Sequence, residues 1–179
     1  MKNGIKKYVT SLCKLYACTE AVEWVGTQPS IAAVWRECKR ADWMLWVLGK
    51  VSGDVGSKSR KKLASCACEC AELALPYAGK HKAVCKRVYA AIRGYHAGTN
   101  TLADVRVAAD AAYALASAAT SAAYAADAAY AAAYAADAAD AAAYAASAAN
   151  AAAYAARGQT LRNAADIVRK HYPRAPRLK

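Results

Sequence analysis

Basic and aromatic side chains are the groups of this 179-residue chain that are best suited to binding a ligand. Guanidinium and ammonium groups hold phosphates, and tryptophan or tyrosine rings stack on a nucleobase. The chain contains four Trp and twelve Tyr but no Phe, so each of these rings also carries a polar group. The candidate contacts to a small anionic ligand are Arg36, Arg40, Trp43, Lys61, Lys62, Lys82, Lys86 and Arg93.

Two tryptophans lie three residues apart in a predicted helix over residues 42–49. Trp43 and Trp46 therefore share one face of that helix, because residues at i and i+3 are neighbours on a helix surface. The rest of the segment is apolar, which is typical of a helix in the core. Core packing is one interpretation of the pair, and the aromatic wall of a ligand pocket is the other.

Two groups of basic residues also fall on predicted helices. Residues 58–62 place four Lys/Arg side chains at a helix N-terminus, which opposes the helix dipole unless an anion binds nearby. A solvated run of charges is the alternative interpretation. In the predicted helix over residues 82–96, Lys82, Lys86 and Arg93 line one side and give it a basic stripe.

Seven cysteines are the other reactive groups, and we expect reduced thiols in a chain without an export signal. The cluster Cys66, Cys68 and Cys70 invites a metal interpretation. On a helix, however, Cys66 and Cys70 share a face while Cys68 points to nearly the opposite side, so three thiolates would not converge on one ion. We therefore expect small core residues and no metal site here.

The sequence pattern does not bring together the ionisable and nucleophilic side chains that an active site needs. The three His are scattered, no pair of carboxylates shares an apolar face, and no Ser or Cys has the surroundings of a nucleophile. The loop predicted over residues 50–59 lacks the order of a phosphate-binding loop, because Gly56 is followed by Ser57 and then Lys58. We therefore expect a protein that is not an enzyme and that uses no cofactor.

Helices account for all the predicted elements, so the expected fold class is all-α. Apolar residues recur at helical spacing over residues 3–26, as one or two helices, and over residues 31–40, 42–49, 61–77 and 82–96. Ser30, Asp42 and Thr160 are expected to cap the helices that follow them. The last of these helices ends at Pro173.

An alanine-rich run over residues 107–157 dominates the second half of the chain. Alanine has the highest helix propensity, so we expect helix from about residue 102, with Thr101 and Asp104 at its cap. Larger side chains recur about every 3.3 residues and drift around a straight helix of about 3.6 residues per turn. The run therefore predicts either a supercoil with partner helices, and hence a homo-oligomer, or a break near residues 117–121 into shorter helices packed on the N-terminal part.

The formal net charge of +12 favours an anionic partner. Residues 1–100 contain 17 Lys/Arg against 7 Asp/Glu, residues 101–156 contain 1 against 5, and residues 157–179 contain 7 against 1. This division predicts a basic N-terminal helical domain (1–100), an alanine-rich helical scaffold (101–157), and a C-terminal helix with a basic tail (158–179). A long nucleic acid is disfavoured as a partner, because the scaffold is acidic and no DNA-binding motif is present.

No segment has the pattern of a signal peptide, since charges at Lys14, Glu20 and Glu23 interrupt the stretch that follows the basic residues 1–8. No uncharged stretch is apolar and long enough for a membrane-spanning helix. We therefore expect a cytoplasmic protein, in the bacterial host cytosol, with no membrane partner.

Several segments resemble, in order, the successive blocks of one family of proteins. They are residues 17–24 (ACTEAVEW), 42–49 (DWMLWVLG), 63–71 (LASCACECA), the alanine-rich run, and 165–173 (ADIVRKHYP). The family is a group of phage and bacterial proteins labelled immunity proteins. The resemblance implies an all-helical fold and a setting in phages or conflict systems, and it supplies no catalytic residues.

These features together predict a non-catalytic, immunity-related binding protein that counters a defence system. In the first interpretation, the basic residues and rings sequester a small anionic, nucleotide-type immune signal. In the alternative, the chain is an immunity or inhibitor protein that blocks a toxin or a host defence protein by direct contact.

Overall fold

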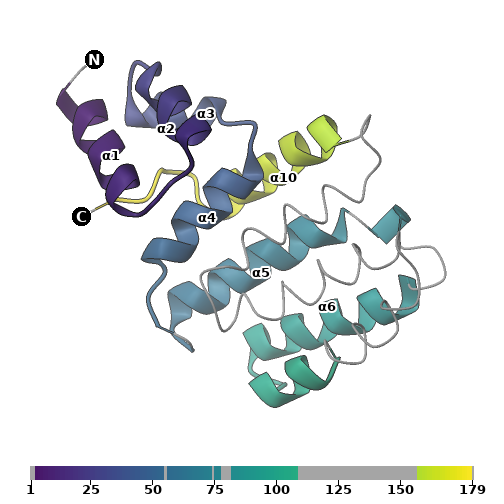
Figure 1. Cartoon of the computed structure of the whole chain (residues 1–179). Coiled ribbons are helices and arrows are strands. Elements are labelled where there is room, and N and C mark those ends of the chain that lie inside the picture. Colours follow the sequence, from purple (N-terminus) through teal and green to yellow (C-terminus); the bar gives the residue numbers. More distant parts are fainter. Residues whose placement is uncertain (1–2, 55, 74, 78–81, 109–156, 179) are drawn as a thin grey trace.

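A computed structural model gives the fold and describes residues 3–54, 56–73, 75–77, 82–108 and 157–178 (Figure 1). All elements in these ranges are helices, so the predicted all-α fold class is confirmed. Residues 109–156 of the alanine-rich run lie outside the described residues, and so do the predictions of a long or broken helix and of oligomerisation through it. None of the described helices combines the length and the apolar character that a membrane crossing requires.

The order of the helices follows the hydrophobic periodicity of the sequence. Residues 3–26 form two helices separated by a turn. The loop before α5 covers residues 52–57 instead of the predicted 50–59, because α4 continues to Val51 and α5 begins at Lys58. Two helices end earlier than predicted, the one expected over residues 31–40 at Glu37 and the one expected over residues 61–77 at Glu72. Residues 102–108 are helical as well. The described elements are α1 (Asn3–Lys14), α2 (Thr19–Gly26), α3 (Ile31–Glu37), α4 (Ala41–Val51), α5 (Lys58–Glu72), η1 (Leu75–Tyr77), α6 (Lys82–Ala97) and α10 (Arg157–His171).

Two of the predicted helix caps are confirmed by their hydrogen bonds. Ser30 Oγ accepts a hydrogen bond from the Ala33 amide at 3.1 Å and so caps α3. The Asp104 carboxylate accepts from the amide and the hydroxyl of Thr101, and the Asp104 amide donates in return to Thr101 Oγ1. Such reciprocal bonds satisfy amides that a helix start would otherwise leave without partners.

The other two predicted caps are wrong. Arg40 occupies the cap position of α4, and Asp42 lies inside the first turn. The Asp42 carboxylate binds the Arg40 guanidinium at 2.6 Å, because an ion pair competes successfully with capping for the same oxygens. Thr160 lies inside α10, which begins at Arg157, since tertiary packing as well as local capping decides where a helix starts.

Helix α5 is the centre of the fold, with α4 and α10 on one side and α6 on the other (Figure 1). Cys66 and Cys70 of α5 belong to one core cluster, shared with α1, α3, α4 and α10, whereas Cys68 belongs to a second cluster shared with α6. The predicted division of the three thiols between opposite helix faces is therefore confirmed. Small side chains on both faces of α5 allow its neighbours to approach closely.

The C-terminal helix α10 packs into the same core as the N-terminal helices. Its buried Ala164, Ala165 and Val168 belong to the cluster that α4 and α5 also form. On the surface of this packing, His171 Nε2 lies 2.8 Å from a carboxylate oxygen of Glu69 on α5. The two ends of the chain thus depend on each other for burial of their apolar surface.

The buried thiols predict a loss of stability in alkali. Burial raises the pKa of Cys68 to about 12, and it also raises the pKa values of Cys38 and Cys85. Above about pH 8.5 such thiols stay protonated in the folded chain but ionise in the unfolded chain. The free energy of unfolding should therefore decline above that pH, by about 1.4 kcal/mol per pH unit for Cys68 until the pH approaches its raised pKa of about 12.

Urea unfolding between pH 7 and pH 11 measures this decline. The variant Cys68→Ala should show a shallower slope than the unmodified chain, whatever its stability at neutral pH. An unchanged slope in that variant would show that Cys68 ionises equally well in both states.

Candidate functional site

Arg40 and Trp43 are the two predicted ligand contacts that the structure brings into direct contact. The guanidinium carbon of Arg40 lies 4.4 Å from the centre of the Trp43 ring, which is a favourable cation–π arrangement. Arg36, on the neighbouring helix α3, is exposed and pairs with the adjacent Glu37 at 2.7 Å.

The predicted contacts on α5 are directed at rings of two different elements. Nζ of Lys61 lies 4.8 Å from the centre of the Tyr95 ring on α6, and Nζ of Lys62 lies 4.8 Å from the centre of the Tyr172 ring, which follows α10. Each ammonium group therefore has an aromatic partner within the fold, and the two lysines do not point to one common site.

The predicted contacts on α6 lie apart from Arg40. Arg93 forms an ion pair with Glu72 of α5, and Lys82 and Lys86 are exposed. None of the predicted residues on α5 and α6 lines the cavity described next. The eight predicted side chains are therefore distributed over α3, α4, α5 and α6.

A cavity of about 390 Å³ lies between α1, α2, α3 and α4, and all four tryptophans of the chain line it. Trp24 comes from α2, Trp35 from α3, and Trp43 and Trp46 from α4. Its volume falls in the range of small-molecule sites, about 300–1,000 Å³. The other lining residues are Tyr8, Leu12, Tyr16, Ala17, Cys18, Ala21, Val25, Val34, Cys38, Arg40, Asp42, Met44 and Val47.

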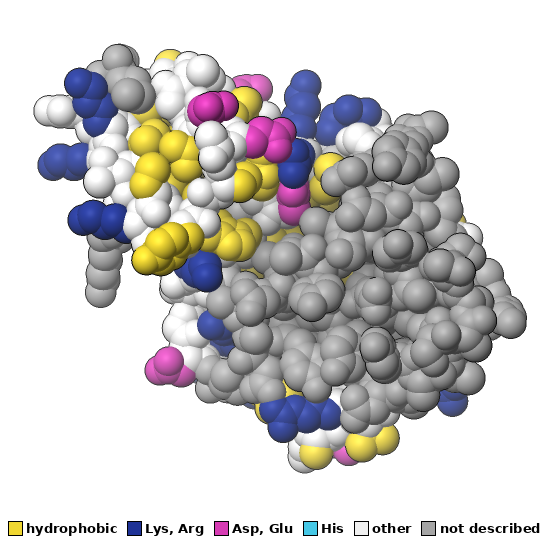
Figure 2. Space-filling model, in the orientation of Figure 1, with side chains coloured by type: hydrophobic (Ala, Val, Ile, Leu, Met, Phe, Trp, Pro, Cys, Tyr) yellow, Lys and Arg dark blue, Asp and Glu magenta, His cyan; other side chains and the backbone are white. Residues whose placement is uncertain are grey.

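The cavity has an apolar floor and an open rim. Trp35 and Met44 are buried in the floor, whereas Tyr16 and Cys18 are exposed at the rim. Hydrophobic side chains gather over α1 and α2 on the upper left of Figure 2, with acidic side chains beside them. A ligand can therefore enter from solvent and lose contact with water as it reaches the floor.

Two partly exposed indoles form the part of the wall that a planar group could contact. The ring centres of Trp24 and Trp43 lie 6.0 Å apart, with an angle of 51° between the ring planes. Aromatic pairs prefer such tilted arrangements, and a third ring can add to them by an offset or edge contact. The wall thus suits a planar aromatic group better than a branched aliphatic one.

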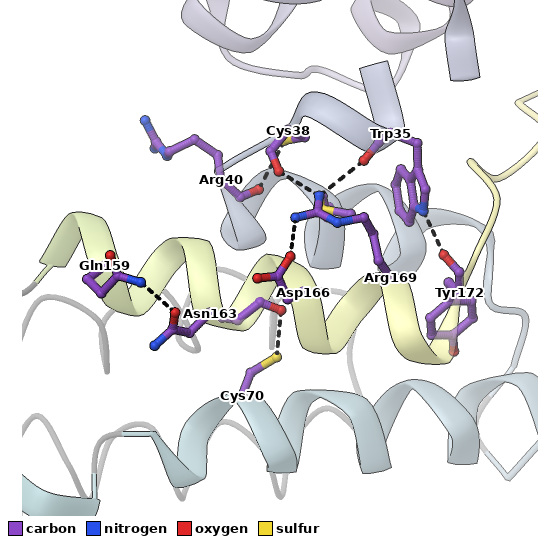
Figure 3. A network of polar contacts seen from close by, with 11 residues as sticks. Trp35, Cys38, Arg40, Cys70, Gln159, Asn163, Asp166, Arg169 and Tyr172 are labelled. Carbon is purple, nitrogen blue, oxygen red and sulfur yellow. Dashed lines mark hydrogen bonds and ion pairs between the residues drawn. The ribbon is translucent and has the colours of Figure 1, made fainter. Parts of the chain in front are cut away.

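Helix α10 positions the α3 side of the cavity (Figure 3). The Trp35 indole Nε1–H donates to the Tyr172 carbonyl at 2.6 Å. The Arg169 guanidinium donates to the carbonyls of Trp35 and Cys38, at 3.2 Å and 2.8 Å. A cation at the last carbonyls of a helix stabilises its end, so α10 holds the short helix α3 and the segment that leads to Arg40.

Among the described lining residues, Arg40 is the one Lys or Arg, and it is held by two carboxylates. Its Nε and Nη2 atoms donate to both oxygens of Asp42, at 2.9 Å and 2.6 Å, and Nη1 lies 3.2 Å from Glu20. The hydrogen bond to Asp42 raises the pKa of Arg40, so the guanidinium stays charged. An anionic ligand must therefore compete with these carboxylates, and the exposed Glu20 is the partner that is easier to displace.

Two ionisable side chains in the wall of the cavity are buried. Burial raises the pKa of Tyr8 to about 12 and also raises the pKa of Cys38, so both keep their protons near neutral pH. No His lies among the described lining residues, and Asp42 is already bound to Arg40. Within the described ranges, no group of three His, Cys, Asp or Glu side chains could hold a metal ion.

Sequence reasoning identified Arg40 and Trp43 but missed most of the wall. Trp24, Trp35 and Tyr16 were absent from the predicted set, because they belong to separate helices and a turn that no local pattern connects. One signal was present in the sequence: every tryptophan lies between residues 24 and 46. Such crowding of the largest aromatic side chain in one part of the chain is a usable indication of an aromatic site.

The geometry of this cavity is the observation that bears on function, and the resemblance to the immunity-protein family stays a prediction. Comparison of the chain with protein-family models, curated proteins and solved structures gives no match.

Proposed function

We propose that this chain is a non-catalytic binding protein that captures a small ligand by a planar aromatic ring. The observation that supports the proposal best is that all four tryptophans line one cavity of about 390 Å³. Stacking on an aromatic side chain is worth about 1–3 kcal/mol for each nucleobase. The cavity lies near the lower end of the range for small-molecule sites, so one ring system fits inside it and a sugar phosphate attached to that ring lies at the open rim.

A nucleotide-type ligand makes use of both Trp43 and Arg40. Its base lies against the indoles of Trp24 and Trp43, and its phosphate takes the place of Glu20 beside the Arg40 guanidinium. The ion pair of Arg40 with Asp42 remains and orients the guanidinium. By this binding the protein sequesters a nucleotide signal of bacterial immunity. Such a role fits the setting in phages or conflict systems that the resemblance implies.

Direct contact with a toxin or a host defence protein is the second candidate function. It is supported by the exposed Lys82 and Lys86 on α6, which the cavity does not use, in a chain of net charge +12. A partner with an acidic surface suits such a helix face, because complementary charge speeds association.

Calorimetry with AMP, adenosine and ribose 5-phosphate tests the nucleotide proposal. We expect AMP and adenosine to bind and ribose 5-phosphate not to bind, because the ring supplies the main contact. AMP should bind more tightly than adenosine, and Arg40→Gln should remove that difference. Trp43→Leu should weaken both complexes by roughly tenfold, as expected for the loss of one stacking contact.

Two controls test whether the nucleotide binds in the cavity and not elsewhere on the chain. Cys13 and Cys18 are both exposed, but only Cys18 lines the cavity, so a bound nucleotide should slow the reaction of Cys18 with a thiol reagent and leave Cys13 unaffected. The double variant Lys82→Glu, Lys86→Glu should bind AMP as the unmodified chain does.

Cyclic dinucleotides and ADP-ribose complete the panel. If no member of the panel releases heat or protects Cys18, nucleotide capture is wrong. A stable complex with a host protein that the Lys82→Glu, Lys86→Glu variant loses would then support the second candidate function.

A further inference from the structure

Tyr16 occupies a backbone position that suits glycine. It follows the end of α1 and has a φ of +63°, which among the described residues is the one positive φ outside glycine. The Tyr16 amide donates to the Cys13 carbonyl at 2.9 Å, and the Ala17 amide donates to the Leu12 carbonyl at 3.0 Å. These two bonds define a Schellman turn with Tyr16 in the left-handed position that glycine usually takes.

Burial of the Tyr16 ring does not offset the free-energy cost of this backbone conformation. The left-handed region brings the Cβ atom of a tyrosine close to the following carbonyl oxygen, whereas glycine has no such contact. The side chain of Tyr16 is 92% exposed, so it buries almost no apolar surface. The next residue, Ala17, packs on the core instead and completes the apolar contact that such turns make.

Tyr16 also lines the tryptophan cavity on its open side. A disfavoured backbone conformation, a large exposed ring and a position at the rim of a cavity therefore coincide in one residue. Residues held in such disfavoured conformations cluster at active sites and ligand-binding sites.

We propose that Tyr16 is a ligand-contacting residue whose ring covers the planar group held against the indoles of the cavity. The inference rests on the proposed aromatic-ligand function and adds the residue that closes the open side. The ligand class it implies is a flat aromatic compound gripped between Tyr16 and the wall that contains Trp24 and Trp43. Stacking on both sides shields such a ligand from water and slows its release.

Three substitutions of Tyr16 separate its backbone effect from its ring effect. Tyr16→Gly removes both the strain and the ring, Tyr16→Asn removes the ring and keeps a residue that tolerates the left-handed region, and Tyr16→Phe keeps the ring. The probe is 8-anilinonaphthalene-1-sulfonate, an aromatic anion whose fluorescence increases on transfer to an apolar site. Its Kd and the melting temperature are measured for each variant and for Trp43→Leu.

We expect Tyr16→Gly to raise the melting temperature by roughly 2–6 °C, as relief of the left-handed strain predicts for a chain of this size. The same variant should bind the probe about tenfold more weakly, because one stacking contact is lost. Tyr16→Asn should bind as weakly as Tyr16→Gly, and Tyr16→Phe should bind as the unmodified chain does.

Results that differ from these expectations would overturn either the role of Tyr16 alone or the proposed function as well. Unchanged affinity in Tyr16→Gly, together with weaker binding in Trp43→Leu, would overturn the role of Tyr16 and leave the proposed function standing. A lower melting temperature in Tyr16→Gly would show that the ring serves the fold, which also overturns the inference. If the unmodified chain binds neither this probe nor AMP in a saturable manner, both the inference and the proposed function are wrong.

Discussion

Replacing Arg169 by methionine should lower the free energy of unfolding by about 3 kcal/mol, even though a quarter of the side chain is exposed. Arg169 joins α10 to the end of α3 through hydrogen bonds to the carbonyls of Trp35 and Cys38, at 3.2 Å and 2.8 Å (Figure 3). Hydrogen bonds from a charged donor contribute about 1.5–3 kcal/mol each, and both carbonyls would lose this partner. Methionine keeps much of the aliphatic volume of arginine, so the decrease in the free energy of unfolding reports on the hydrogen bonds of the guanidinium group.

Urea unfolding of Arg169→Met measures this loss, and Arg162→Met is the matched control on the same helix. Arg162 is exposed, and among the described residues its hydrogen-bond partner is Gln159 of the same helix, at 2.8 Å, so its replacement should change stability by less than about 0.5 kcal/mol. Equal losses in the two variants would show that α10 does not depend on the contacts to α3. Because Trp35 belongs to the cavity wall, Arg169→Met should also weaken ligand binding.

Replacing Ala21 by phenylalanine should weaken binding of an aromatic ligand by about 100-fold or more, without loss of stability. Ala21 is 8% exposed and lines the tryptophan cavity, so an added ring occupies the volume that the ligand needs. The same ring fills empty apolar space. Filling a cavity commonly stabilises a protein, so we expect an unchanged or higher melting temperature.

The matched control is Ala32→Phe, which adds the same ring at an exposed position of α3 that does not line the cavity. Calorimetry with AMP and fluorescence titration with 8-anilinonaphthalene-1-sulfonate both measure the effect. We expect Ala32→Phe to bind either ligand as the unmodified chain does. Retained binding in a folded Ala21→Phe variant would place the ligand outside the cavity and would refute the proposed site.

The fold class and many local features could be predicted because they depend on neighbours along the chain. Helical periodicity indicated each described α-helix, and the spacing of Cys66, Cys68 and Cys70 indicated their division between two faces of α5. Ser30 was recognisable as a cap because its partner is only three residues away. The prediction for Asp42 was wrong because its carboxylate binds the Arg40 guanidinium instead.

The candidate site could be predicted only in part, because its members come from four helices and a turn. Arg40 and Trp43 are three residues apart and meet at the start of one helix, so their sequence spacing was informative. Lys61 and Lys62 are adjacent, yet they reach Tyr95 and Tyr172, which lie on different elements. The run of basic residues in the sequence therefore did not correspond to one anion site.

The sequence by itself determined that this protein is helical, in which segments of the chain its described helices lie, and which residues are small enough to let α5 pack on both faces. These properties follow from side-chain propensity and periodicity, which act over a few residues. The tertiary structure alone decided that the four tryptophans meet at one cavity, that Arg169 holds the end of α3, and that Tyr16 stands exposed at the rim in a left-handed turn. Burial and helix-to-helix contacts set these features, and they join residues that are far apart in the chain.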